Sequence, residues 1–432
     1  MNSPVLLARE LRWQTRLHLA GSLNRPVISV TLRAPSRLRQ LSEYRAAFDV
    51  LSGGLERLFY HEGLVLEPLL STFDAEGPAR HYAAGDALIA KRLCARFEEE
   101  APGGEMLDID LMDEHARPLS RGDINMPPRA CLVCGSRPAA LCVAGRVHDQ
   151  GETEAAFDRL LREVLKSEAW INHVARTALK SLLYEVSVTP KPGLVDRDNP
   201  GAHGDMDYYS FIDSAAALAP YFSRCAALGR DSLCEPGDIL SRLRPPGLEA
   251  EEAMKRATGG ANTHKGLIFS LGILCAAAGR LGEGTDTSAL CDLAAEIAAP
   301  ALGDLPAGSH GDLARERYGA LGARGEAAGG FPAARLALIE LREALDAGES
   351  VDRAGVKALL RLMAGVRDTN VLYRAGEEGL AFVQSGARAL LQLGVPDEEL
   401  ERFCADMTLL RISPGGCADL LAIAFFLRLL FV

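Results

Sequence analysis

The feature that most constrains the fold is a change of sequence pattern near residue 150. Beyond it, Ala- and Leu-rich stretches of helical length recur, separated by Gly-, Pro- and Asp-rich segments, and no alternating β-type pattern appears. This pattern predicts an all-α domain. The predicted helices span 155–184, 208–228, 248–257, 266–281, 287–301, 331–347, 351–365, 376–394, 397–410 and 416–431.

Before residue 150, short β-type runs alternate with helical segments, which predicts a mixed α/β (α+β) domain. The expected elements are strands at 28–35 and 63–73, a helix at 85–100, and a strand–turn–strand over 106–120. A polar segment, 144–156, is the expected linker. The predicted domains therefore cover residues 1–150 and 156–432.

Composition restricts the class of protein. The net charge is −11 over 432 residues, which argues against binding to nucleic acid or an anionic membrane. Ten cysteines in so long a chain are too sparse for a disulfide scaffold, and the N-terminus lacks the apolar core of a signal peptide. The apolar C-terminus contains Asp419 and Arg428, which favours a buried helix over a membrane span. We expect a cytoplasmic protein.

Two carboxylates stand out in the first domain. In the predicted strand MLDIDLM, Asp108 and Asp110 share one face, and the apolar residues between them face the other way. Paired carboxylates backed by an apolar face can hold Mg²⁺ together with substrate phosphates. The alternative is an acidic edge strand exposed to solvent.

Arginine dominates the basic residues before residue 160, where Lys91 is the one lysine. Arginine favours bidentate contact with phosphate, but high-GC codon usage and solvated faces would give the same bias.

Four potential metal ligands follow in the order C-x2-C-x7-C-x5-H. Cys131, Cys134, Cys142 and His148 are ligand types that suit a structural zinc ion, although the spacing matches no standard zinc finger. The alternative is a set of small, buried hydrophobic residues near a turn.

Five polar segments lie between the predicted helices, and each was expected to be a loop or a helix start. They are 185–207, 258–266 (TGGANTHKG), 322–332, 367–379 and 412–421. Helix starts preceded by glycine offer N–H groups and a positive dipole end to phosphate, and carboxylates can hold Mg²⁺ or act as a base. Together they predict a site for a polyphosphate nucleotide with Mg²⁺.

These motifs resemble two known families. The stretches EVSVTPKPGLVDRDNPGAHGDMD, TGGANTHKGLIFSLG, ARGEAAGGFP, DTNVLYRAGEEGLAFV and ISPGGCADLLA resemble the triphosphoribosyl-dephospho-CoA synthase family. ELRWQTR, the LDID strand, SRGD and PPRACLVC resemble the apo-citrate lyase phosphoribosyl-dephospho-CoA transferase family. The chain looks like a fusion of the two, with a nucleotidyltransferase-like first domain.

The resemblance implies two reactions. The helical domain would join ATP and 3′-dephospho-CoA to form 2′-(5″-triphosphoribosyl)-3′-dephospho-CoA and release adenine. The first domain would then transfer phosphoribosyl-dephospho-CoA to a serine of the apo acyl-carrier (gamma) subunit of citrate lyase and release pyrophosphate. Mg²⁺ would serve both steps, and zinc is a further candidate in the first domain.

The resemblance also suggests residue roles. Phosphate or nucleotide binding in the helical domain is expected of Lys191, Gly259, Gly260, Asn262, His264, Lys265, Arg324 and Asn370. Metal binding or base catalysis is expected of Asp196, Asp205, Asp207, Asp368, Glu377 and Glu378. In the first domain, Asp108 and Asp110 would bind metal, with Asp123 as a third ligand, and the phosphates would contact Arg12, Arg16, Arg121 and Arg129.

Two alternatives stay open. The same chemistry could load the acyl-carrier subunit of a malonate decarboxylase. A catalytically silent, nucleotide-binding regulator could also use this fold.

Overall fold

The computed structural model describes residues 3–231, 235–303 and 317–431. The chain divides into two compact units, residues 1–169 and 170–432. The division falls beyond the segment 144–156 that was expected to be the linker. Helix α5, Gln150–Ser187, begins inside that segment and contributes residues to the cores of both units.

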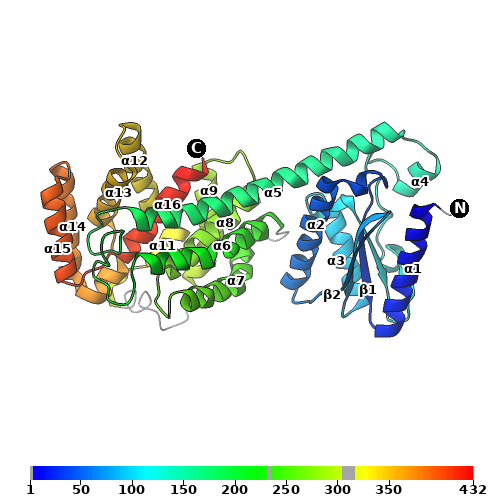
Figure 1. The fold of residues 1–432 in the computed structure, drawn as a ribbon, viewed down its shortest axis with the longest axis horizontal. Helices are drawn as coiled ribbons and strands as arrows, with labels where there is room; N and C mark the ends of the chain where they lie inside the picture. The colour runs from blue at the N-terminus through cyan, green and yellow to red at the C-terminus, as the bar shows by residue number, and fades with distance from the viewer. Residues whose placement is uncertain (1–2, 232–234, 304–316, 432) are drawn as a thin grey trace. The chain divides into compact units, whose positions relative to one another are not determined.

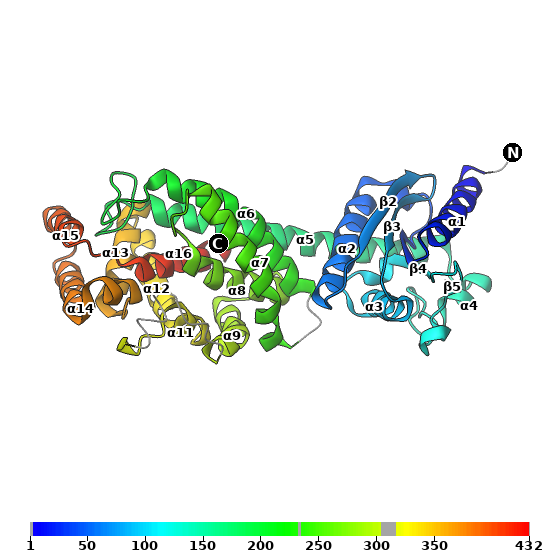
Figure 2. The ribbon, with the colours of Figure 1, turned by 90° about the horizontal axis from the view of Figure 1, so that it is seen from below.

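The first unit is built on a five-stranded antiparallel sheet with the order β2-β3-β1-β4-β5 (Figures 1 and 2). Its strands are β1 (Val27–Leu32), β2 (Glu67–Asp74), β3 (Gly77–Ala83), β4 (Leu107–Met112) and β5 (Pro118–Leu119). The predicted strands and the 106–120 hairpin are present, whereas β3 was not predicted.

Helices cover both faces of this sheet. α2 (Ser42–His61), α3 (Ala87–Glu100) and the first half of α5 bury one face through the alternate β1 residues Ile28, Val30 and Leu32. α1 (Pro4–Leu23) lies on the other face, where Ala20 packs with Val27 and Met112 (Figure 2). Alternation along β4 leaves its two aspartates on the α1 side, as the sequence predicted. α4 (Ala139–Ala144) follows in the segment before α5.

Among the described residues of the second unit, all regular secondary structure is helical, as predicted. Its helices after α5 are α6 (Tyr208–Asp231), α7 (Pro236–Ala257), α8 (Lys265–Leu281), α9 (Thr287–Ala298), α11 (Gly322–Ala328), α12 (Pro332–Asp346), α13 (Val351–Gly365), α14 (Thr369–Gln392), α15 (Asp397–Leu409) and α16 (Gly415–Leu430).

Two of the predicted loops are wholly or partly helical. Residues 322–328 form α11, and α14 begins at Thr369, seven residues before the predicted helix. Gly376, at φ +65°, interrupts α14, and the predicted helix 376–394 begins at this residue. α7 also starts earlier than predicted: it begins at Pro236 instead of residue 248, and Pro245 and Pro246 lie inside it.

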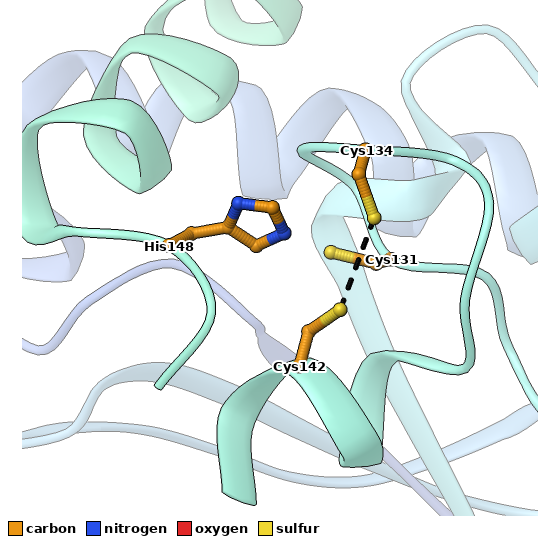
Figure 3. A group of neighbouring side chains, drawn as sticks. All are labelled: Cys131, Cys134, Cys142 and His148. Atoms are coloured by element: carbon orange, nitrogen blue, oxygen red, sulfur yellow. Dashed lines mark hydrogen bonds between the residues drawn. The ribbon is translucent and has the colours of Figure 1, made fainter. Parts of the chain in front are cut away.

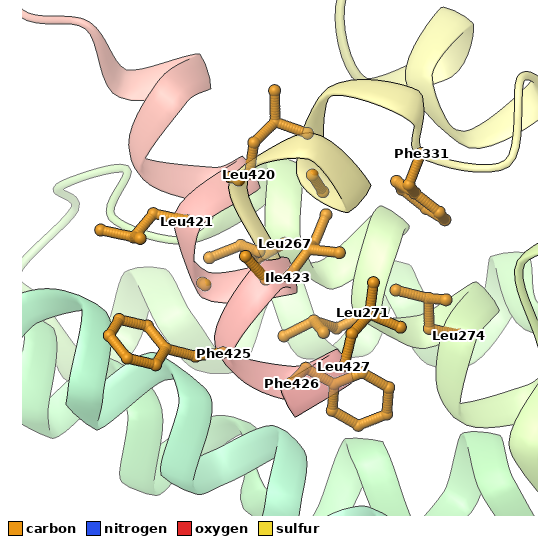
Figure 4. Packing of buried hydrophobic residues seen from close by; sticks show 14 of the residues in the cluster. Leu267, Leu271, Leu274, Phe331, Leu420, Leu421, Ile423, Phe425, Phe426 and Leu427 are labelled. Atoms are coloured by element: carbon orange, nitrogen blue, oxygen red, sulfur yellow. The ribbon is translucent and has the colours of Figure 1, made fainter. Parts of the chain in front are cut away.

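α8 and α16 form the centre of the second core. Leu267, Leu271 and Leu274 of α8 pack with α16 residues that include Ile423 and Phe426 (Figure 4). α16 is the buried C-terminal helix that the sequence predicted. No helix among the described residues has the length and apolar character that crossing a membrane requires.

α6 and α8 run parallel and touch at the backbone. A Cβ at Gly229 would lie 1.9 Å from the carbonyl oxygen of Ala276, and a Cβ at Gly279 would lie 1.9 Å from that of Ala226. Tyr221 of α6 donates a hydrogen bond to the carbonyl of Ile268 at 2.9 Å. Only glycine allows so close an approach of the two helices.

Candidate active sites

The second unit encloses a cavity of about 1450 Å³, which is larger than most sites for a single small ligand. The starts of α8, α14 and α16 and the segment after α5 all line it. Its wall includes seven basic residues and six carboxylates. They are Lys191, Lys265, Arg324, Arg361, Arg367, Arg374 and Arg388, with Glu185, Asp205, Glu251, Glu326, Asp368 and Asp419.

Lys191 is buried in this wall and forms an ion pair. Its Nζ donates to Glu185 Oε1 at 2.5 Å and to the Glu185 carbonyl at 2.8 Å. Burial raises the pKa of the Glu185 carboxyl, and the Lys191 ammonium opposes that shift. Asp196 is also buried, and its carboxylate accepts backbone N–H bonds from Lys191, Asp198 and Asn199. Asp196 therefore shapes this segment and does not line the cavity.

His264 precedes α8 and is part of a hydroxyl chain. Thr263 donates to Ser214 Oγ at 2.7 Å, and Ser214 Oγ lies 2.7 Å from His264 Nδ1. If Ser214 donates a hydrogen bond to Nδ1, that nitrogen is the acceptor and the neutral imidazole carries its hydrogen on Nε2. Nε2 is buried and has no hydrogen-bond partner in the described part of the chain. Burial lowers the pKa of His264 to about 3, and Lys191 adds to the effect, so the ring is neutral.

Asp368 connects two helix starts. Its Oδ1 accepts hydrogen bonds from the N–H groups of Asn370 and Val371 in α14, and its Oδ2 accepts one from Cys417 in α16. Burial raises the pKa of Asp368, and these N–H groups oppose the shift. The carboxylate is fully used as a cap, which leaves it little capacity for metal.

Asp419 is one of four lining carboxylates that the sequence prediction omitted from the site, together with Glu185, Glu251 and Glu326. It lies in the first turns of α16, faces the cavity, and makes no hydrogen bond or ion pair with any described residue. Burial raises its pKa well above the usual range, and the charges of Glu185 and Asp368 raise it further. The sequence signal was available, because Asp419 follows the glycines of SPGG by one helical turn.

Gly266 makes room for that carboxylate. A Cβ at Gly266 would lie 2.0 Å from Asp419 Oδ2. The last glycine of TGGANTHKG therefore brings the start of α8 against Asp419. Neighbouring Lys265 forms an ion pair with Glu251 at 3.1 Å, and its N–H bonds to Asn262 Oδ1 at 3.3 Å.

His203 and Asp205 line the cavity from the segment between α5 and α6. His203 Nε2 lies 2.8 Å from Ser413 Oγ, and its Nδ1 lies 3.8 Å from Asp205 Oδ1. Burial lowers the pKa of His203, and Arg374 contributes to the decrease. The Asp205 carboxylate is 67% exposed and Arg374 is exposed, so both are accessible from the cavity.

The cavity is also lined by three further predicted residues, Asn262, Arg324 and Asn370. Besides Asp196, five predicted residues of this unit lie outside its lining. Gly259 and Gly260 terminate α7, with Gly260 N–H bonded to the Lys255 carbonyl at 2.8 Å. Asp207 caps α6 through Ser210. Glu377 pairs with Arg367, and both it and Glu378 are exposed outside the lining.

In the first unit, the β4 carboxylates each meet an arginine. Asp110 forms an ion pair with Arg16, and Asp108 Oδ1 lies 3.1 Å from Arg129 Nη1. The carboxylates are 54% and 45% exposed, so solvent reaches them. Ser29, across the ladder from Asp110, bonds to the buried His81 at 2.8 Å.

The other predicted arginines of this unit have structural partners. Arg12 is buried and bonds to Asp74 and to the Gly77 carbonyl. Arg121 pairs with Glu98, which also accepts from Arg129. Asp123 closes a turn with Ser120.

The four Cys/His residues come together (Figure 3). Their ligand atoms all lie within 4.8 Å of one another. A hydrogen bond from Ser136 lowers the pKa of the Cys134 thiol to about 5, and His148 adds to the decrease.

Comparison with known families decides the identity of the two units. Residues 171–432 match the model of the ATP:dephospho-CoA triphosphoribosyl transferase family, and residues 2–164 match that of the apo-citrate lyase phosphoribosyl-dephospho-CoA transferase family. The chain is a fusion of these two families. It is therefore a transferase, and the resemblance found in the sequence is confirmed.

Some relatives match nearly the whole chain, and others match only a little over half of it. Protein CitXG of Haemophilus influenzae is 31% identical over 98% of this chain and 94% of its own length. Protein CitXG of Leuconostoc mesenteroides subsp. cremoris is 31% identical over 98% and 96%. The 2-(5″-triphosphoribosyl)-3′-dephosphocoenzyme-A synthase of Klebsiella pneumoniae is 42% identical over 57% of this chain and 87% of its own.

Proposed function

We propose that the chain makes and attaches the prosthetic group of citrate lyase. The second unit would convert ATP and 3′-dephospho-CoA to 2′-(5″-triphosphoribosyl)-3′-dephospho-CoA and adenine. The first unit would transfer phosphoribosyl-dephospho-CoA to a serine of the apo acyl-carrier subunit and release pyrophosphate. The observation that carries the proposal is the cavity in which Asp419, cationic side chains and the starts of α8 and α16 meet.

In the first reaction, a ribose hydroxyl of dephospho-CoA attacks C1′ of the ATP ribose, and the bond from C1′ to adenine breaks. Asp419 is suited to take the hydroxyl proton, because its raised pKa makes it a stronger base than an ordinary carboxylate. In its ionised form, the carboxylate would also stabilise the positive charge that develops on the sugar.

The triphosphate stays intact in this reaction, so the cavity must bind it without activating it. Lys265 and Arg374 line the wall near two helix starts, which also favour anions. The neutral His264 can donate a hydrogen bond from Nε2 to substrate. When bound, Mg²⁺ would neutralise phosphate charge, and the exposed Asp205 fits it better than Asp196, which accepts backbone N–H bonds, or the helix caps Asp207 and Asp368 do.

In the second reaction, a carrier serine attacks an α-phosphate and pyrophosphate leaves. Asp108 and Asp110 share one face of β4 and are open to solvent, so they fit Mg²⁺ bound together with phosphate oxygens. Arg16 and Arg129, which pair with them here, would move their guanidinium groups onto the phosphates.

The test is to incubate the purified chain with ATP, Mg²⁺ and dephospho-CoA, and to measure adenine by chromatography. Adenine should appear only when dephospho-CoA is present. Apo acyl-carrier subunits of citrate lyase and of malonate decarboxylase are then added separately and analysed by mass spectrometry. No adenine release would refute the first step, and adenine release without loading of the citrate lyase carrier would refute the second.

A further inference from the structure

The segment 130–149 of the first unit contains a cluster of ligands with no role in either reaction. We propose that Cys131, Cys134, Cys142 and His148 bind one zinc ion, which stabilises this segment (Figure 3). Cys₃His is a common ligand set for structural zinc in proteins.

The spacing of the ligand atoms fits a tetrahedral ion. Tetrahedral zinc with Zn–S bonds of about 2.3 Å places two sulfur atoms about 3.8 Å apart. Cys134 Sγ and Cys142 Sγ are 3.8 Å apart, and no pair of the four ligand atoms exceeds 4.8 Å. A disulfide would need about 2.05 Å between sulfur atoms and would leave the third cysteine and the histidine unexplained.

The backbone holds the first two cysteines in a tight turn. The Cys131 N–H donates to the Arg137 carbonyl and the Gly135 N–H to the Cys131 carbonyl, both at 2.7 Å. Gly135 has φ +65°, a conformation that glycine adopts readily. Cys142 comes from α4, so the sulfur atoms of a turn and a helix converge (Figure 3).

His148 provides an independent sign of a missing partner. Its Nε2 is buried and has no hydrogen-bond partner among the residues that the structure describes, a costly state for a polar atom. Its Nδ1 lies 3.8 Å from Glu152 Oε2, and that oxygen also accepts the Asp149 N–H at 3.0 Å. A carboxylate behind a histidine is the usual support of a metal ligand, here tied to the start of α5.

The segment buries few apolar side chains, although Leu132 packs against the core of the first unit. Leu141, Val143 and Val147 are 63%, 78% and 45% exposed, and none belongs to a hydrophobic cluster. Cys131 and Cys142 are the buried apolar residues between positions 130 and 149. A segment with so little core needs another source of stability, and zinc binding supplies it directly.

The zinc site would also position an active-site arginine. Arg129 precedes the turn, and its carbonyl accepts the Ala139 N–H at 2.8 Å, while its guanidinium lies 3.1 Å from Asp108. Arg129 is thus held between the metal cluster and β4. This second part of the inference depends on the proposed function, whereas zinc binding does not.

Zinc content of the purified full chain tests the proposal directly. About one zinc per chain is expected, with Cys142→Ser losing most of it and Cys404→Ser, a partly buried thiol of α15, retaining it. Because Cys142→Ser could unfold the first unit, chelated wild-type chain is also titrated with Co²⁺, which should show the intense visible absorption of tetrahedral thiolate coordination. Failure to bind either metal, or a Cys134–Cys142 disulfide in peptide maps, would overturn the site.

The positioning part has a separate test. Chelated wild-type chain should lose carrier loading by about 10-fold or more, recover it on adding zinc, and release adenine at an unchanged rate. If the chain binds zinc but loads the carrier equally well without it, the metal does not position Arg129. Absence of loading in both forms would instead count against the proposed transfer reaction.

Discussion

Gly266→Ala tests whether Asp419 acts in the reaction. The new Cβ would lie 2.0 Å from Asp419 Oδ2, where an ordinary contact needs about 3.4 Å. The carboxylate must therefore move by about 1.4 Å, since it is the mobile end of a side chain. Misplacing a reacting group by about 1 Å can cost about 100-fold in rate, or about 2.7 kcal/mol. We expect adenine release to fall by at least that factor.

The fold should tolerate the same change. Alanine is favoured over glycine in helices by up to about 1 kcal/mol, so the melting temperature should stay equal or rise. The assay is initial-rate adenine release with both substrates varied, beside thermal unfolding followed by circular dichroism. Gly237→Ala is the matched control, because Gly237 is also the second residue of its helix and its nearest neighbour would be 3.7 Å away. Unchanged rates in the Gly266→Ala variant would refute the role of Asp419.

Three further predictions separate the two units and their buried groups. Asp108→Asn should abolish carrier loading and leave adenine release intact; loss of both activities would contradict separate sites. Lys191→Met leaves the buried Glu185 without its ion-pair partner and should lower the free energy of unfolding, measured by urea titration, by about 3–5 kcal/mol. Lys265→Met is the control: it breaks a more exposed ion pair and should lower the free energy of unfolding by less than about 1 kcal/mol. Because the pKa of His264 falls from 6.5 to about 3 on folding, the unfolded chain alone binds that proton between these pH values. Stability should therefore fall as pH drops from about 6.5 toward 3, and His264→Asn should flatten that slope.

The spacing of apolar residues predicted most of the helices and strands, because residues that recur on one face of an element are the ones that become buried. The predicted helix at 351–365 matches α13, and the C-terminal helix matches α16 to within one residue. The predicted helix boundaries were wrong where glycine or proline, which often end a helix, lie inside one. Gly376 interrupts α14 without ending it, and Pro245 and Pro246 lie inside α7.

The site was predicted less well than the fold, for a related reason. An aspartate before a helix can bind metal or cap the helix, and the sequence does not distinguish these uses. Asp207 and Asp368 proved to be caps. Asp419 was passed over because it lies inside a helix, although the packing of α16 against Gly266 places its carboxylate in the cavity. Which carboxylates keep free oxygens depends on tertiary contacts.

The backbone contact of α6 with α8 gives the cavity a hidden dependence on two distant positions. Ser214 lies near the start of α6, and His264 precedes α8, so their hydrogen bond reports on the spacing of the two helices. That spacing is fixed far along both helices by Gly229 and Gly279, which face carbonyl oxygens and not substrate. A methyl group at Gly229 or Gly279 would push α6 and α8 apart. The hydrogen bond between Ser214 and His264 would then be lost, although no substrate-binding atom had been altered. Residues without any chemistry of their own can thus be as intolerant of substitution as the reacting groups.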